Sequence, residues 1–345
     1  MYPHDFRCGE MEVNMKNILL LDTSVGSLNK GDEIIMRCVK EELEFLLRDN
    51  FILNIPTHLS PFNSYQVLRN SNRVQIYKDA ILKFVGGTNL LIPNLFTHFP
   101  QWNINFLNYK PIKGCILVGV GAGPGKKSNL YTKTLYKKIL NTQYYHSVRD
   151  ERSKTILENY GLKAINTGCV TMWKLTPEFC NCIPISKSDN VVFTLTAKSN
   201  IDVRDQILIN ILNKNYKKLY FWPQGYDDYN YLMKFEHINN INIIDSDLNE
   251  FEKLLSSSNI EYVGTRLHGG IFAMRNKKRS IIIVIDERAR EINKSNNLNC
   301  IEKSKINELE LMINSDFATH IKMPLQEIER WKGQFQNNES VVNNL

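Results

Sequence analysis

The chain has 345 residues, more than one hydrophobic core usually supports, so its length favours two domains. Its content of 43% hydrophobic and 23% charged residues excludes a disordered chain. A formal net charge of +7 favours anionic ligands, but the charge is modest and scattered, and no nucleic-acid partner is predicted.

The cysteines and the N-terminal residues bear on the compartment. Seven cysteines without a C-x-x-C pair favour a reducing environment over a disulfide framework. Residues 1–14 are polar and lack a signal-peptide pattern, and no apolar run has the length of a membrane span. The histidines are scattered without ligand spacing, so no metal is predicted. We therefore expect a cytoplasmic protein.

The first half alternates apolar strands with amphipathic helices. Lys16–Asp22 is a continuous apolar run, typical of a strand buried on both faces of a parallel sheet. A helix is predicted to open at Gly31, with Asp32 as its candidate N-cap. Further elements follow in the same alternation: strands at 51–55, 81–85, 113–120 and 145–149, one helix within 56–80, and helices at 130–140 and 150–160. This order predicts parallel βαβ units.

The pattern breaks near Pro177 and Pro184, which indicate a linker, and a second alternating set follows. It comprises strands at 191–195, 218–221, 241–244, around 262–263 and at 280–285, and helices at 203–213, 229–235 and 248–257. Amphipathic helices are predicted at 306–313 and 325–335. The predicted division is an extension at 1–15, an N-terminal domain at 16–175, a linker at 176–190, a C-terminal domain at 191–305, and helices with a polar tail at 306–345.

One turn between a strand and a helix stands out as a candidate anion site. Arg266 and His268 fall where the strand near Val263 gives way to a short helix, and unpaired backbone N–H groups at a helix start attract anions. Glycine-rich segments at 86–87 and 119–125 also follow strands, so facing halves would gather these loops in one cleft. The alternative is a helix cap with a core histidine, and glycines that serve only tight turns.

Several short segments, taken together, resemble the polysaccharide pyruvyl transferase family. The matching segments run in the family's order over roughly residues 16–295: Asn29–Glu33, Gly86–Asn89, Gly119–Pro124, Ser147–Asp150 with Ser153, Thr167–Cys169, and Val263–Gly269 followed by Asp286 and Arg288. The resemblance implies an α/β, GT-B-like fold, in which two Rossmann-like domains with parallel sheets face each other across a cleft.

The resemblance also implies a reaction and a donor site. The family transfers the pyruvyl group of phosphoenolpyruvate to two hydroxyls of a saccharide, forming a cyclic ketal, and phosphoenolpyruvate is the co-substrate with no cofactor. Arg266 and His268 match the family's donor-binding Arg-Leu-His, and Arg149 matches its arginine from the opposite domain. We assign His268 as proton donor beside these two arginines. The full predicted donor site is Arg149, Arg266, Leu267, His268, Gly269, Gly87 and Gly121.

The acceptor site is predicted from carboxylates and aromatic faces near the strand ends. A carboxylate can accept a proton from a sugar hydroxyl, and a flat ring can lie against a sugar. The candidates are Asp32, Asn29, Trp222, Gln224, Asp227 and Asp228. For Asp32 a helix cap is the alternative, and for Trp222 packing in the core. Asp286 and Arg288 are read as a salt bridge at the cleft edge.

Two other functions remain open from the sequence. One is a glycosyltransferase of similar fold that uses a nucleotide sugar, and the other is a non-catalytic protein that binds a saccharide or phosphate. A lipid-linked acceptor would also bring the chain to the inner membrane face. The candidate basic patches for that contact are Lys126–Lys127 and Lys277–Arg279, for which a solvated face is the alternative reading.

Overall fold

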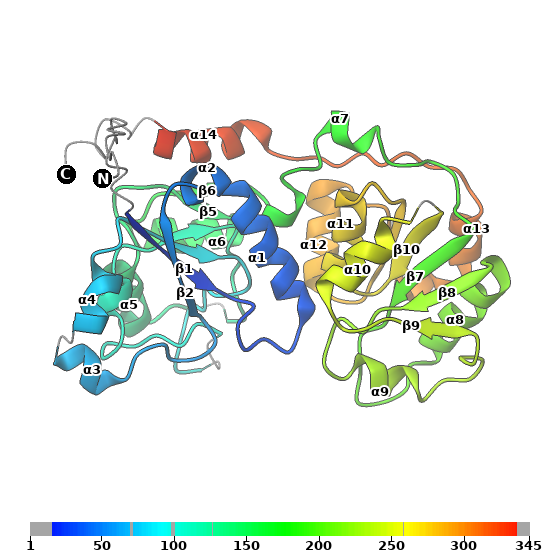
Figure 1. The fold of residues 1–345 in the computed structure, drawn as a ribbon, viewed down its shortest axis with the longest axis horizontal. Helices are drawn as coiled ribbons and strands as arrows, with labels where there is room; N and C mark the ends of the chain where they lie inside the picture. Colours follow the sequence, from blue (N-terminus) through cyan, green and yellow to red (C-terminus); the bar gives the residue numbers. More distant parts are fainter. Residues whose placement is uncertain (1–15, 70–71, 98–100, 126, 258, 337–345) are drawn as a thin grey trace, which may run out of the picture.

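The computed structural model describes residues 16–336, apart from 70–71, 98–100, 126 and 258. The predicted N-terminal extension and the polar tail from 337 lie outside the described residues. Two α/β lobes lie side by side along the long axis of the molecule (Figure 1). The predicted domain boundaries stay predictions, while the strands before residue 176 and those from residue 190 onward form separate sheets.

The first lobe is built on a parallel sheet with the strand order β2-β1-β3-β4. Its strands are β1 (Asn17–Asp22), β2 (Phe51–Pro56), β3 (Leu82–Gly86) and β4 (Ile116–Val118). A bridge from Val120 to Val148 continues toward a parallel pair, β5 (His146–Val148) and β6 (Ala164–Asn166). The core of β1, from Ile18 to Leu21, is almost fully buried because strands flank it on both sides and helices cover its faces.

Helices of this lobe alternate with its strands, as βαβ units require. They are α1 (Lys30–Glu42), α2 (Glu44–Leu47), α3 (Ser64–Leu68), α4 (Asn72–Lys78), α5 (Leu130–Ile139) and α6 (Glu151–Asn159), with 3₁₀ turns η1 (Lys110–Ile112) and η2 (Val170–Met172).

The second lobe carries a six-stranded parallel sheet with the order β12-β11-β10-β7-β8-β9. Its strands are β7 (Asn190–Thr194), β8 (Lys218–Phe221), β9 (Ile241–Ile243), β10 (Ile260–Gly264), β11 (Ser280–Val284) and β12 (Cys300–Glu302). Its helices are α8 (Val203–Asn215), α9 (Asp228–Leu232), α10 (Leu248–Leu255), α11 (Leu267–Arg275), α12 (Glu287–Asn296), η3 (Lys303–Glu308) and α13 (Leu309–Ile313). Strand β10 lies centrally and is buried along its whole length, so its carboxyl end is fixed firmly in the molecule.

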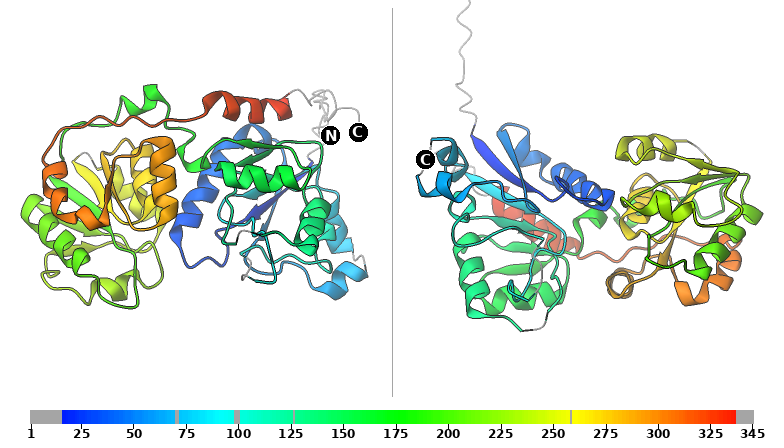
Figure 2. Two further views of the ribbon diagram at one scale, coloured as in Figure 1. Left: turned by 180° about the vertical axis from the view of Figure 1, so that it is seen from behind. Right: turned by 90° about the horizontal axis from the view of Figure 1, so that it is seen from below.

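The chain crosses between the lobes twice. The first crossing contains α7 (Pro177–Cys180), and the second leads from α13 back to α14 (Leu325–Gln336), which lies on the first lobe (Figures 1 and 2). Trp331 of α14 is fully buried, and its ring contacts the rings of Trp173 and Phe84 edge-on. The last helix therefore completes the core of the first lobe.

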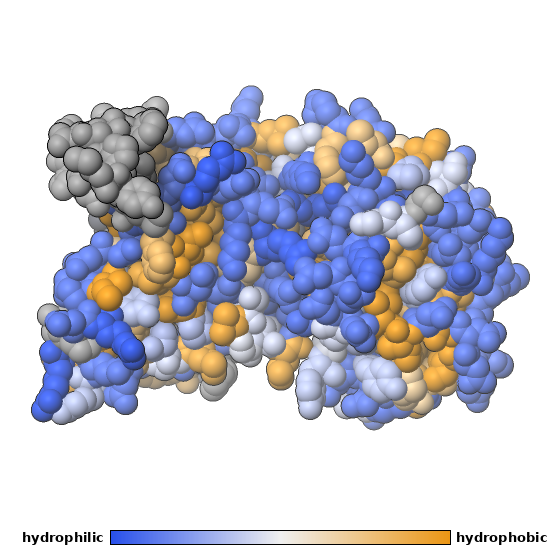
Figure 3. All heavy atoms as spheres, viewed as in Figure 1, coloured by the Kyte–Doolittle hydropathy of each residue, from blue (hydrophilic) through white to orange (hydrophobic). Residues whose placement is uncertain are grey.

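Helix α1 forms a seam between the lobes. Arg37 donates to Glu252 at 2.6 Å and to Asn249 at 2.8 Å, both on α10. Farther along α1, Glu41 pairs with the buried Arg275 of α11. The surface over this region is mostly hydrophilic, and the outline is notched between the lobes at its lower edge (Figure 3). These contacts hold the ends of the two sheets in a defined relation.

Short or highly charged elements were missed by the sequence patterns. Strands β6 and β12 span three residues each, too few to show alternation, and the segment 56–80 holds two helices where one was predicted. Helix α12 was not predicted because its sequence is strongly polar. Asp32 is not the cap of α1, as Asn29 is the N-cap residue and accepts from the backbone N–H of Gly31.

The predicted basic patch at 277–279 is not a continuous surface feature. Arg279 is buried and donates to Glu261 at 2.7 Å and to main-chain carbonyls of residues 312, 313 and 315. Its charge is thus neutralised inside the second lobe. Across the described ranges, no helix combines the length and apolar character that crossing a membrane requires.

Candidate active site

His268 lies at the start of α11, where the sequence placed it. Gly264 ends β10 so close to Thr194 that a side chain there would overlap it, and the chain turns at once into the helix. His268 is only 5% exposed. Burial lowers its pKa well below 6.5, and the charges of Arg288 and Arg149 lower it further. The imidazole is therefore neutral in the free protein at physiological pH.

Arg149 reaches the same region from the first lobe. It follows β5, and its side chain is 6% exposed. The guanidinium donates to the side-chain oxygen of Asn89 and lies 3.5 Å from a carboxylate oxygen of Asp150. It passes directly over Gly121, where any Cβ would overlap it. Gly121, which was predicted at the donor site, therefore leaves the space that the side chain of Arg149 occupies.

Groups from the two lobes meet beside His268. The thiol sulfur of Cys169, in the first lobe, lies 3.8 Å from Nε2 of His268 in the second lobe. The positive charge of Arg149 lowers the pKa of that same imidazole. The structure thus brings Arg149 and His268 together. Cys169 lies against His268, a position that the sequence resemblance marked only as part of a motif.

Arg266 is close by but is engaged by the protein itself. Its Nε donates to Oδ2 of Asp228 at 3.0 Å, and a terminal nitrogen binds Oδ1. The Asp228 carboxylate is fully buried and also accepts from the backbone N–H of Gly225 at 2.7 Å and of Ala197 at 3.0 Å. A bidentate pair of this kind neutralises Arg266 and fixes its orientation.

Arg288 is the cation that the sequence analysis did not assign to the site. It lies in the first turn of α12, and its Nε is buried without a hydrogen-bond partner in the described structure. Its nearest carboxylate, Asp286, is 3.8 Å away, so the predicted salt bridge is long. Its charge lowers the pKa of His268, of Arg149 and of Asp32. The signal in the sequence was the Asp-x-Arg segment after β11.

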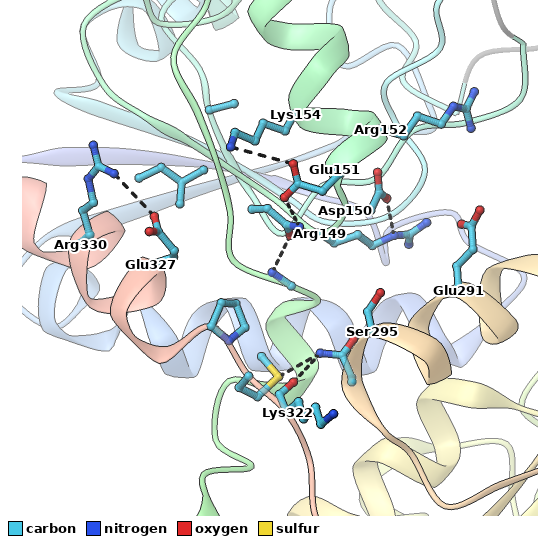
Figure 4. Close-up of a pocket in the computed structure, with 17 residues that line it drawn as sticks. Arg149, Asp150, Glu151, Arg152, Lys154, Glu291, Ser295, Lys322, Glu327 and Arg330 are labelled. Atoms are coloured by element: carbon cyan, nitrogen blue, oxygen red, sulfur yellow. Dashed lines mark hydrogen bonds and ion pairs between the residues drawn. The ribbon is translucent and has the colours of Figure 1, made fainter.

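Two hollows adjoin these groups. A small cavity of about 50 Å³ is lined by His268, Arg266 and Arg288. A much larger pocket of about 710 Å³ lies between α6, α12 and the second crossing (Figure 4). Arg149 lines this larger pocket, while its charge also reaches His268. Arg149 therefore belongs both to the large pocket and to the cationic cluster, which consists of Arg149, Arg266, Arg288 and His268.

The match to a family of known proteins covers most of the chain. A model described as "Polysaccharide pyruvyl transferase" matches residues 29–287, which include every group of the cluster except Arg288. The chain belongs to the polysaccharide pyruvyl transferase family. It is therefore a transferase of the kind that modifies polysaccharides. The comparison with curated proteins gives no match.

The strand topology and one solved structure confirm the predicted fold class. The Staphylococcus aureus MnaA–UDP co-structure resembles this pyruvyl transferase family member with a TM-score of 0.53 and 11% identity, covering 96% of this chain and 98% of that one. A UDP-GlcNAc 2-epimerase of Methanocaldococcus jannaschii, in complex with UDP-GlcNAc and UDP, gives a TM-score of 0.48 and 14% identity, covering 94% and 100%. The architecture is GT-B-like, with parallel sheets in two lobes.

Asn29 and Gln224, two predicted acceptor residues of this family member, lie in the seam between the lobes. They hydrogen-bond each other at 2.9 Å, and the backbone N–H of Lys30 donates to the carbonyl of Gln224 at 2.8 Å. Gly31 packs so closely here that a Cβ would lie 2.9 Å from Gln224 and 3.4 Å from His268. These residues join the lobes directly beside the imidazole.

The structure corrects two of the other acceptor predictions. Trp222 is fully buried and stacks on Phe251 with ring centroids 4.0 Å apart, so it is a core residue and offers no face to a sugar. Asp228 is likewise buried and bound to Arg266, so it positions that arginine and does not face solvent. Asp227, its neighbour, is exposed.

Asp32 faces the region between the lobes from the first turn of α1. Its carboxylate accepts from the hydroxyl of Ser27 at 2.5 Å. Burial raises its pKa above 3.8, while hydrogen bonds from Ser27 and Thr88 and the charge of Arg288 act in the opposite direction. A half-buried carboxyl with a raised pKa beside these cations is a candidate acid–base group.

The predicted donor-site glycines and Leu267 are structural neighbours of this cluster. Gly87 directly follows β3, and any Cβ there would overlap the carbonyl of Gly119, so two loops of the first lobe approach backbone to backbone. Gly269 packs against Gln224 and Tyr262. Leu267 lines the small cavity with His268. Their shared effect is close packing behind the charged groups.

Proposed function

We propose that this chain transfers the pyruvyl group of phosphoenolpyruvate onto two hydroxyls of a saccharide, giving a cyclic ketal. The observation that carries this proposal is the meeting of groups from the two lobes. His268 and Arg288 line one cavity, and Arg149 of the first lobe lies near enough for its charge to lower the pKa of the imidazole. Two cations and one group able to carry a proton are what the donor's two anionic groups and its protonation chemistry require.

The donor presents a carboxylate and a phosphate to these cations. A guanidinium binds either group in a bidentate manner, and Arg149 and Arg288 approach from different lobes. The buried Nε of Arg288 lacks a protein acceptor within the described residues, so the donor supplies one. The first backbone N–H groups of α11 add a further anion-binding contribution. Arg266 holds the loop after β8 in place through Asp228.

His268 becomes an acid only after the donor binds. The anionic donor offsets the charges that lower the pKa of the imidazole, so the ring takes up a proton. It then protonates the methylene carbon, and C2 gains oxocarbenium character. One sugar hydroxyl adds to C2, the bond from C2 to the phosphate oxygen breaks, and the second hydroxyl closes the ketal. Each hydroxyl gives up one proton. One proton restores His268 and the other leaves with phosphate.

Asp32 is the carboxyl that we assign to receive one hydroxyl proton and to pass it to the departing phosphate. Its raised pKa makes it a stronger base than an ordinary aspartate, and it lies on the same seam as His268. The family match supports a saccharide as the proposed acceptor. The cytoplasmic location and a lipid-linked acceptor at the inner membrane face both remain predictions from the sequence.

The test couples phosphate release to ketal formation. Phosphoenolpyruvate is incubated with a panel of saccharides while phosphate is measured, and mass spectrometry detects the pyruvyl increment on the acceptor. His268→Ala is expected to retain donor binding by calorimetry and to lose turnover by a hundred- to ten-thousand-fold, as is roughly typical for a positioned acid. His320→Ala, at an exposed histidine, is the matched control.

Three results contradict the proposal. Turnover of a nucleotide sugar without any use of phosphoenolpyruvate identifies a glycosyltransferase. Donor binding without turnover across the whole panel identifies a binding protein. Normal turnover by the His268→Ala protein removes the imidazole from the mechanism.

A further inference from the structure

We infer that the acceptor binds in the large pocket between α6 and α12 as a neutral saccharide chain, and not beside the loop at 222–228. This inference rests on the proposed function and adds the location and charge class of the second substrate. Figure 4 shows the pocket with α6 of the first lobe on one side and α12 of the second on the other.

The loop at 222–228 leaves no room for a sugar near His268. The Asn29–Gln224 hydrogen bond, the Lys30–Gln224 bond and the bond from the N–H of Tyr226 to the carbonyl of Leu28 at 3.0 Å close this side. The cavity behind them holds only about 50 Å³. A sugar ring entering here breaks several hydrogen bonds between the lobes at once, and each broken bond leaves buried groups without partners.

The large pocket has the size that an acceptor needs. Its volume of about 710 Å³ falls within the roughly 300–1,000 Å³ of small-molecule sites. Arg149 and Gly168 line it, and Cys169, the neighbour of Gly168, lies 3.8 Å from Nε2 of His268. A saccharide in this pocket therefore lies beside the side chain of Arg149, which we assign to bind the donor.

The lining of the pocket suits a neutral, hydroxyl-rich ligand. Five basic and four acidic side chains line it, together with the amides of Asn166 and Asn296. Charges of both signs nearly cancel, so a polyanion gains little net attraction. Carboxylates and amides, by contrast, offer the acceptor and donor atoms that sugar hydroxyls use.

Glu291 is the residue best placed to bind a sugar hydroxyl. It projects from α12 into the pocket with Ser295, and the two lie four residues apart on one helix face (Figure 4). In the part of the chain that the structure describes, Glu291 forms no ion pair. On the opposite wall, Glu151 is already held by Asn166 at 2.8 Å and by Lys154 at 3.9 Å. Glu291 is the carboxylate left available for the ligand.

Two variants test the location. Glu291→Gln removes the charged acceptor and is expected to raise the KM for the saccharide about tenfold, with the KM for phosphoenolpyruvate unchanged. Ser295→Trp fills the pocket from an exposed helix position and is expected to raise the saccharide KM further. Glu329→Gln, on α14 and outside the pocket lining, is the matched control. Thermal melting checks that each variant folds.

A binding measurement separates the inference from the proposed function. Saturation-transfer NMR of the saccharide, without donor, is expected to show contact with the native protein and loss of contact in both variants. If the native protein forms ketal while Glu291→Gln and Ser295→Trp leave the saccharide KM unchanged, only the location is wrong. If Asp227→Asn raises the saccharide KM while Glu291→Gln and Ser295→Trp do not, the acceptor binds at the loop at 222–228. If the native protein forms no ketal with any saccharide, the proposed function itself fails.

A separate experiment tests whether the acceptor saccharide is neutral. The same saccharide is supplied with and without a phosphate on the neighbouring position, and the neutral form is expected to have the lower KM. A lower KM for the phosphorylated form overturns the neutral assignment.

Discussion

Arg266 and Asp228 form a bidentate ion pair whose carboxylate is fully buried. The same carboxylate accepts two backbone N–H groups, so it ties the loop after β8 to the start of α11. In this arrangement the carboxylate of Asp228 neutralises Arg266, and the proposed donor is therefore assigned to Arg149 and Arg288.

Replacing Asp228 by Asn is expected to destabilise the protein. The substitution keeps the shape but leaves Arg266 without its countercharge, and breaking a buried pair typically costs roughly 3–5 kcal/mol of unfolding free energy. Chemical denaturation measures this loss. Asp316→Asn, at an exposed position of the same lobe, is the control and is expected to have no effect. Unchanged stability with tighter donor binding would show that Arg266 is itself a donor ligand.

Replacing Gly121 by Ala is expected to displace the guanidinium of Arg149. The new methyl group overlaps the buried guanidinium, and overpacking of this kind costs roughly 1–3 kcal/mol. We expect the KM for phosphoenolpyruvate to rise at least about tenfold, measured by steady-state phosphate release.

The control for that substitution is Gly333→Ala. It lies inside α14 with no atom within 4 Å of the added Cβ, so it should raise stability by up to about 1 kcal/mol through helix propensity. If both alanine variants bind the donor normally, Arg149 does not depend on the space above Gly121.

Donor binding is expected to be coupled to proton uptake. The pKa of His268 lies well below 6.5 in the free protein, and bound anions raise it, so the complex holds more protons and affinity rises as the pH falls. Calorimetry in buffers of different ionisation enthalpy measures the uptake. His268→Gln is expected to take up less than the native protein, because only the imidazole is changed. Equal uptake by both proteins excludes His268 as the group that is protonated.

His146 is expected to make the fold sensitive to acid. The ring is buried, its Nδ1 accepts from the N–H of Leu117 at 3.2 Å, and Nε2 lies 2.9 Å from the carbonyl of Asn141. Burial lowers its pKa to about 4 from 6.5. As the pH falls, the unfolded chain therefore takes up a proton on His146 before the folded protein does. This contribution to the free energy of unfolding is complete above pH 6.5 and is lost between pH 6.5 and about 4, by at most about 3 kcal/mol.

Unfolding by denaturant at a series of pH values checks this slope. His146→Gln keeps a polar side chain without a titrating ring, so its stability is expected to vary less over that range. A native protein whose stability is flat from pH 6.5 to 4 contradicts the assignment.

Local sequence predicted the parts of this fold that depend on neighbouring residues. The apolar run of β1 and the alternation of strands and helices indicated parallel sheets, since a strand buried on both faces must be apolar throughout. The turn at Arg266 and His268 was also placed correctly at the start of a helix. Helix α12, being strongly polar, gave no such pattern, and Arg288 was therefore read only as half of a salt bridge.

What the sequence by itself determined is the architecture, the family and the strand ends that carry charged residues. Only the tertiary structure decided which of those residues meet. Asp228 and Arg266 are 38 positions apart, and Cys169 and His268 are 99 apart. Trp222 is a core residue because Phe251 packs on it. Contacts between residues so far apart in the sequence are set by the packing of helices and loops from different parts of the chain. No periodicity in a single segment encodes such contacts.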